Sequence, residues 1–249
     1  MWIGRTKCSA SIATVMSVDL LVFGPHPDDL EIGLGGTIAR HTSRGLSVGL
    51  CDLTAGELGT NGTVEQRLDE AEQARGVLGA AWRTNLRWPD RGIGTDPAHV
   101  QQAMDLIRQH RPRTVALPYW SDRHPDHAAA SEVLTKAAFD AGLRRQVSAA
   151  EAWKPDWLCY YFINDGATPS FVIDVSDHYE TKRRALDCHT TQFSRADGAA
   201  ATRLNTPLFR QLIESRDAQF GALAGVRWAE GVIVREPLVR STLLKADPG

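Results

Sequence analysis

Four cysteines in 249 residues are few, and no two of them form a C-x-x-C pair. Such scattered thiols argue against a disulfide scaffold or a zinc knuckle, and they suit a reducing, cytoplasmic setting. No apolar run approaches the ~18 residues that a membrane-spanning helix needs. A basic excess is also lacking, since 28 Lys and Arg residues meet 30 Asp and Glu residues. This balance argues against nucleic-acid and anionic-membrane partners.

Short apolar runs alternate with segments of helical periodicity along most of the chain. The predicted strands are 18–23, 46–53, 85–88, 114–118, 157–163, 171–175 and 228–234. The predicted helices are 29–43, 64–78, 97–110, 127–141, 177–188 and 207–223. Alternation of this kind builds βαβ units around a parallel sheet. We therefore expect an α/β fold, a Rossmann-like three-layer sandwich with a mostly parallel sheet and a C-terminal elaboration. Residues 1–16 are expected to form a flexible extension, and 17–249 a single domain.

A turn rich in ionisable groups follows the first predicted strand. It holds His26, Asp28 and Asp29, with Glu31 just behind them. Open α/β sheets bind ligands at the carboxyl ends of their strands, where this turn must lie. A shared divalent cation is the simplest partner for so many polar groups in one short turn. His26 and Asp29 could both reach one ion, which leaves Asp28 free to act beside it.

A second turn of the same kind follows the predicted strand 114–118. It contains His124, Asp126 and His127 and leads into a helix. Two such turns on one sheet edge can close a single site. Two histidines and one aspartate leave a position for water, as in catalytic zinc sites, although Fe²⁺, Mn²⁺ or Co²⁺ would also suit these ligands. The remaining histidines are expected at the surface or at helix ends: His41, His99, His110, His178 and His189.

Two glycine patterns fail as signatures of other enzymes. The G-x-S-x-G match at 45–49 precedes a strand, whereas a nucleophile elbow follows one. In the segment starting at Gly33, Ile38 takes the position of the third glycine of a dinucleotide fingerprint. A nucleotide-binding protein is thus disfavoured. A non-catalytic module with a structural metal stays open as a non-enzymatic alternative.

The motifs resemble those of the LmbE-like, or PIG-L, zinc-dependent N-acetylglucosaminyl deacetylases. The matching segments are His26-Pro27-Asp28-Asp29-x-Glu31, the loop 54–60 and His124-Pro125-Asp126-His127. Softer matches resemble the bacillithiol-biosynthesis deacetylases more closely; they include Pro89-Asp90-Arg91, Asp122-Arg123, Lys182 and Trp228-Ala229-Glu230-Gly231. Thr191 departs from that branch, in which a serine is expected.

The resemblance implies a role for each matching residue. The implied zinc ligands are His26, Asp29 and His127. The implied catalytic groups are Asp28 as general base and His124 as oxyanion stabiliser or acid, with Asp126 orienting His124. The implied substrate contacts are Arg67 and Asp90 to the sugar and Arg123 to an acidic aglycone.

The resemblance also implies an activity. The reaction is hydrolysis of the N-acetyl group of a small-molecule GlcNAc conjugate, foremost N-acetylglucosaminyl malate in bacillithiol biosynthesis. A mycothiol-type inositol sugar is the alternative substrate. We further expect a cytoplasmic homo-oligomer without nucleic-acid or membrane partners.

Overall fold

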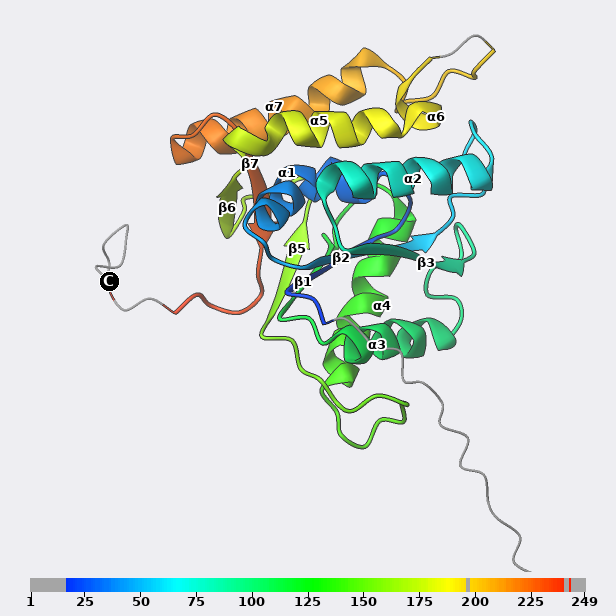
Figure 1. Cartoon of the computed structure of the whole chain (residues 1–249), viewed down its shortest axis with the longest axis vertical. Helices are drawn as coiled ribbons and strands as arrows, with labels where there is room; N and C mark the ends of the chain where they lie inside the picture. The colour runs from blue at the N-terminus through cyan, green and yellow to red at the C-terminus, as the bar shows by residue number, and fades with distance from the viewer. Residues whose placement is uncertain (1–16, 196–197, 240–241, 243–249) are drawn as a thin grey trace, which may run out of the picture.

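A mixed sheet forms the centre of the computed structural model, which describes residues 17–195, 198–239 and 242 (Figure 1). The strand order is β3-β2-β1-β4-β5-β7-β6. The strands are β1 (Leu20–Gly24), β2 (Val48–Thr54), β3 (Trp82–Trp88), β4 (Thr114–Pro118), β5 (Trp157–Tyr161), β6 (Phe171–Asp174) and β7 (Ala229–Ile233). The expected extension 1–16 lies outside the described residues, and the single domain stays a prediction.

The first five strands are parallel, and β7 runs antiparallel to both β5 and β6. β1 is the strand at which the order changes direction, because β2 pairs on one side of it and β4 on the other. The prediction of a mostly parallel α/β sheet with a C-terminal elaboration is confirmed. The elaboration is the antiparallel part and its helices.

Helices cover both faces of the sheet (Figure 1). On one face lie α1 (Asp29–Ser43), α2 (Val64–Leu78), α5 (Tyr179–Cys188) and α7 (Pro207–Ala224); on the other lie α3 (Ala98–His110) and α4 (Pro125–Ala141). Two short helices, η1 (Ser176–His178) and α6 (Thr190–Phe193), flank α5. Among the described residues, every helix is too short or too polar to span a bilayer.

Alternation along β1 produces two separate cores. Leu20 and Val22 face the α1 side, whereas Leu21 and Phe23 face the α3–α4 side. A strand sends successive side chains to opposite faces, so a strand that is apolar throughout must be covered on both. This is why the apolar run of the sequence forms a strand at the centre of the sheet.

Element ends differ from the sequence-based expectation where tertiary contacts decide them. β3 begins at Trp82 because Trp82 pairs with Gly49 of β2, three residues before the expected start. α4 begins at Pro125 because His124 has an extended backbone and its ring accepts a hydrogen bond from the backbone N–H of Asp126.

Three cysteines lie in the described part of the chain, and all three are free thiols. Cys51 and Cys159 are buried. Burial raises the pKa of the Cys51 thiol well above its usual range and that of Cys159 to about 12. Both stay protonated and unreactive near neutral pH, as idle thiols do. Cys8 lies outside the described residues.

Candidate active site

The two His/Asp turns meet at the carboxyl ends of β1 and β4. These strands are neighbours, with Leu20 opposite Thr114, so the turns that follow them are brought side by side. This is the position at which open α/β sheets bind ligands. Asp28 has φ of 115° here. Such a backbone angle is costly for a residue with a Cβ and persists where the surroundings impose it, commonly at functional sites.

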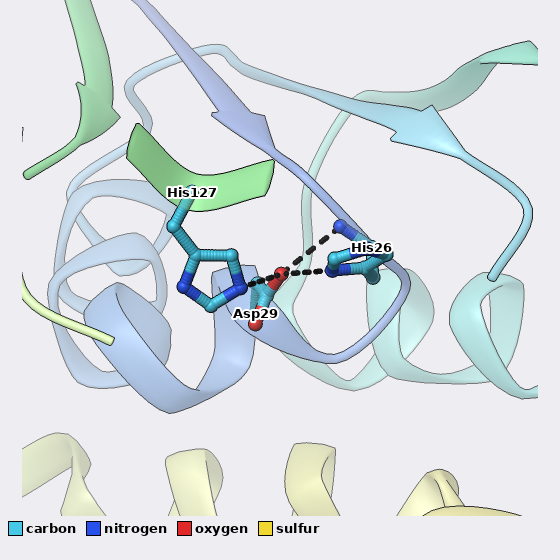
Figure 2. A group of neighbouring side chains, drawn as sticks. All are labelled: His26, Asp29 and His127. Atoms are coloured by element: carbon cyan, nitrogen blue, oxygen red, sulfur yellow. Dashed lines mark hydrogen bonds and ion pairs between the residues drawn. The ribbon is translucent and has the colours of Figure 1, made fainter. Parts of the chain in front are cut away.

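Asp29 lies between the imidazoles of His26 and His127 (Figure 2). Its Oδ2 is 3.1 Å from Nδ1 of His26 and 3.3 Å from Nε2 of His127. One ligand atom from each residue falls within 4.8 Å of the other two. Two imidazole nitrogens and a carboxylate suit a zinc-like cation. The structure thus brings together the three residues expected to be ligands.

Each imidazole presents its other nitrogen to a carboxylate. Nε2 of His26 is 3.3 Å from both Asp126 and Asp90, and Nδ1 of His127 is 3.0 Å from Asp122. Metal-binding histidines are usually oriented in this way, which fixes the tautomer that leaves the inner nitrogen free. Sequence reasoning missed Asp122 as a site residue. Asp122 lies two residues before His124, in a turn ahead of a helix, and this position could have indicated that its carboxylate supports the turn.

The charges of these groups shift one another's pKa values. Burial lowers the pKa of His127, but Asp29 and Asp122 outweigh it and raise the pKa to about 9. Burial alone would raise the pKa of Asp29, and the two imidazoles instead hold it well below its usual range. A cation entering the site therefore displaces protons from the imidazoles.

Asp28 is held by Arg67, which is buried. The Arg67 guanidinium donates to the carbonyl oxygens of Pro27 and Gly56 and lies 3.4 Å from a carboxylate oxygen of Asp28. Gly56 has φ of +65°, and a Cβ there would lie 1.8 Å from the guanidinium. Burial raises the pKa of Asp28 to about 6, against the opposing charge of Arg67. The expected sugar-binding role of Arg67 stays a prediction; the structure adds an anchoring role.

Asp126 contacts His124 through its main chain. The backbone N–H of Asp126, not its carboxylate, donates to Nδ1 of His124 (3.2 Å). The carboxylate accepts from the backbone and side chain of Arg91 and lies near His26. Asp126 can still orient His124, but only through its main chain, because its side chain turns toward His26.

A cavity of about 480 Å³ opens over these groups. Such a volume suits a small-molecule ligand. Asp28, His124 and the three candidate ligands line it together with Arg67, Asp90 and Arg123. Asp90 accepts a hydrogen bond from the backbone N–H of Leu58, which ties the 54–60 loop to the cavity. Every residue expected at the site lines this cavity except Asp126, which lies behind it.

Two of the remaining histidines lie at helix ends, as expected, but both are buried. His189 is fully buried, with Nε2 3.3 Å from Glu31, and His99 is buried and stacks on Trp88. The carboxylate of Glu31 also lies 2.6 Å from Arg83. Spacing alone does not reveal this burial, because His189 lies between α5 and α6 and is covered only when α5 has packed on α1 and α2.

A second, larger hollow of about 580 Å³ lies at the opposite ends of the strands. Its wall is mostly apolar and includes Leu20, Leu34, Ala116, Trp157, Phe171 and Ile173. The candidate ligands and Asp28 line the smaller cavity instead. Convergent ionisable groups mark an active site better than volume does, so the smaller cavity is the candidate.

Comparison with known proteins supports the chemical interpretation. The model of the family described as PIG-L, GlcNAc-PI de-N-acetylase, matches residues 21–138. The chain is 29% identical over 228 residues to the diacetylchitobiose deacetylase of Thermococcus kodakarensis, covering 86% of this chain and 81% of that protein. It is 30% identical over 238 residues to the 1D-myo-inositol 2-acetamido-2-deoxy-alpha-D-glucopyranoside deacetylase of Mycobacteroides abscessus. This match covers 75% of this chain and 85% of that protein.

Solved structures agree on the fold. The conserved protein TT1542 from Thermus thermophilus superimposes with a TM-score of 0.83 and 35% identity, covering 92% of this chain and 100% of that one. A hydratase of Pseudomonas putida, GalB, also superimposes (TM-score 0.75, 92% and 100% coverage), but at 19% identity it shows the fold alone. The family-model match and the 30% identical relative, of which the chain covers 85%, show that this chain belongs to the PIG-L family of GlcNAc-PI de-N-acetylases.

Proposed function

We propose that this protein is a metal-dependent hydrolase that removes the acetyl group from the 2-acetamido group of an N-acetylglucosamine conjugate. One observation carries the proposal: His26, Asp29 and His127 converge from two turns at the base of a cavity that Asp28 and His124 also line. A binding module would need the ligands but not these two additional groups. A cytoplasmic location and a homo-oligomeric state stay predictions from the sequence.

Zinc is the proposed cation, with Fe²⁺, Mn²⁺ and Co²⁺ as alternatives that the same ligands accept. When bound, such a cation acts as a Lewis acid that lowers the pKa of water and polarises an amide carbonyl. The chain supplies three ligands, which leaves room for water and substrate. The orienting carboxylates of Asp122 and Asp126 do not line the cavity, whereas that of Asp90 does.

Asp28 is the proposed general base. It adjoins a proposed ligand, lines the cavity and is buried, and burial raises its pKa toward the range where a carboxylate accepts a proton efficiently. Arg67 keeps the carboxylate ionised and in place. Asp28 takes the proton of the attacking water, and a tetrahedral centre forms at the acetamide carbon.

His124 is the proposed oxyanion stabiliser, one of the two roles that the resemblance implies. Its Nδ1 accepts the backbone N–H of Asp126, so Nε2 carries the proton of the neutral ring. This N–H can donate a hydrogen bond to the developing oxyanion. The proton that Asp28 took from water then passes to the departing amine as the C–N bond breaks, because a neutral imidazole cannot give up its only N–H proton. The products are acetate and a free glucosamine amine.

Different observations favour different aglycones. The cavity wall includes Arg123 and Arg203, both of them accessible at its rim, and their charge favours an acidic aglycone such as the malate of N-acetylglucosaminyl malate. The names of the relatives favour instead an inositol sugar or a GlcNAc disaccharide. We place N-acetylglucosaminyl malate first on the charge argument and keep the inositol sugar as the second candidate.

A substrate panel tests the proposal. Acetate release is measured from N-acetylglucosaminyl malate, the GlcNAc–inositol conjugate and diacetylchitobiose, with metal content determined on the same sample. We expect release from at least one, and fastest from the malate conjugate. Release from the inositol conjugate alone would overturn the malate assignment. Fully metal-loaded protein that releases no acetate from any of them would overturn the hydrolase and favour a sugar-binding module.

A further inference from the structure

Helix α1 is interrupted one turn after the proposed ligand Asp29. Leu34 has φ of −135° and ψ of 16°, which is not helical, although helix continues on both sides. Gly33 precedes the break, and a Cβ there would meet the ring of Tyr161 at 2.2 Å. The first turn of α1 is therefore a short separate unit pressed against β5, and Asp29 lies at its start.

Charged side chains from outside α1 hold both sides of this break. Arg216 of α7 donates to the carbonyl oxygen of Ile32 (2.7 Å). The two carboxylate oxygens of Glu230 in β7 accept from the backbone N–H groups of Gly36 (2.9 Å) and Thr37 (2.7 Å). A broken helix leaves backbone groups in need of partners, and here the C-terminal elaboration provides them.

Arg216 and Glu230 belong to one ionic network. Asp217 accepts from Arg216 (3.1 Å), and Lys182 of α5 lies 2.6 Å from both Asp217 and Glu230. Lys182, Asp217 and Glu230 are fully buried. Two cations balance two anions, which is the condition under which buried charges are tolerated. Hydrophobic residues would stabilise such a core at least as well, so the charges suggest a specific positioning task.

Arg216 also contacts the segment after β5, part of which lines the cavity. It donates to the carbonyl oxygens of Phe162 (3.1 Å) and Ile163 (2.8 Å), which follow β5. The next residue, Asn164, donates from its backbone and side chain to Asp122, the carboxylate that holds His127. One guanidinium thus links the turn that carries Asp29 to the segment that supports His127.

We propose that Arg216 and Glu230 are positioning residues, which hold the first turn of α1 and the segment after β5 in register across the active site. The inference rests on the proposed function. Neither residue contacts the candidate ligands. Arg216 acts through a carbonyl group about one turn from Asp29, and Glu230 acts through N–H groups about two turns from it. A shift of about 1 Å in such an arrangement can cost about 10²-fold in rate.

The test compares Arg216→Lys with a matched control, Arg108→Lys. Arg108, which is buried, also donates to carbonyl oxygens, of Asp140, Ala141, Leu143 and Gln146, but these lie at or just beyond the C-terminal end of α4. A lysine keeps the charge in both places and cannot reach several carbonyl oxygens at once. We measure the melting temperature, the zinc affinity of metal-free protein by chelator competition, and kcat and KM at full zinc loading.

Both variants should melt at a lower temperature. Only Arg216→Lys should bind zinc more weakly, by about tenfold or more, because losing a residue that orients metal ligands has an effect of this size. Its kcat should fall about 10–100-fold, while KM changes less than about threefold. Zinc affinity and kcat within about twofold of the Arg108→Lys values would show a merely structural role and overturn the proposal.

A second variant covers the case in which Arg216→Lys does not fold. Glu230→Gln keeps the size of the side chain but can accept only one of the two N–H groups at the break. The same loss of zinc affinity and kcat is expected, and values within about twofold of wild type would overturn the proposal. If wild type itself releases no acetate, the proposed function fails, yet the zinc-affinity comparison still decides the positioning role.

Discussion

Replacing Asp122 with asparagine should leave the imidazole of the proposed ligand His127 less well oriented. Asp122 itself does not line the cavity, so the cavity wall keeps all its side chains. All five groups around the Asp122 carboxylate are donors. Oδ1 accepts from the backbone N–H of His124 (2.8 Å), the amide of Asn164 (3.1 Å) and, at 3.0 Å, faces Nδ1 of His127. Oδ2 accepts from the backbone N–H groups of Asn164 (2.9 Å) and Asp165 (3.3 Å). In either orientation, an asparagine turns its NH₂ group toward donors.

The size of the effect follows from these contacts. Each buried donor left without an acceptor costs about 1–3 kcal/mol. Loss of a carboxylate that orients a metal-binding imidazole typically costs about 10–100-fold in affinity, or about 1.4–2.8 kcal/mol. We therefore expect Asp122→Asn to bind zinc about 10–100-fold more weakly than wild type and to melt at a lower temperature.

Chelator competition on metal-free protein measures the zinc affinity, and circular dichroism confirms that the variant is folded. Asp174→Asn is the matched control. The Asp174 carboxylate also closes a turn, accepting from the backbone and hydroxyl of Ser176, but it lies on β6, away from the cavity. A folded Asp122→Asn protein with zinc affinity within about twofold of the control would refute the proposed orientation of His127.

Three further predictions follow from the same geometry. Asp28→Asn should retain the metal and lose about 10²–10⁴-fold in kcat, measured at full metal loading; a rate near wild type would refute the base assignment. Lys182→Met leaves Asp217 and Glu230 with one cation fewer, so the free energy of unfolding should fall by about 3–5 kcal/mol in thermal melts. The double variant Lys182→Met/Glu230→Gln should recover part of that loss. A Lys182→Met protein as stable as wild type would contradict the charge-balance argument. The pKa of His127 in the metal-free protein is raised to about 9, so the ring is protonated at pH 7. Zinc binding should then release protons, and its affinity should fall as the pH is lowered below about 9; identical calorimetric heats in buffers of different protonation enthalpy would contradict this.

The alternation of strands and helices could be predicted because each element carries its own period. α1 and α2 begin and end at the expected residues. The apolar runs of β1 and β4 identified the strands whose ends carry the site. The two turns were identified from composition alone, since a concentration of imidazoles and carboxylates in a short turn is expensive without a shared partner.

Contacts between distant segments could not be predicted in the same way. The sequence shows two histidines in the second turn, and the residues alone do not say which one faces Asp29. The pairing of β1 with β4 and the start of α4 place His127 there and leave His124 at the cavity. The main-chain contact from Asp126 to His124 and the burial of His189 also arise only in the folded chain.

The amino-acid sequence by itself determined the types of the candidate ligands, the layer architecture and the edge of the sheet at which the candidate site lies, because these depend on local periodicity and composition. Tertiary structure alone decided which nitrogen of each imidazole faces inward, and how Arg216 and Glu230 hold the break in α1. The physical reason is distance along the chain: these contacts join residues that are far apart in sequence, and they form only when the sheet has set its register.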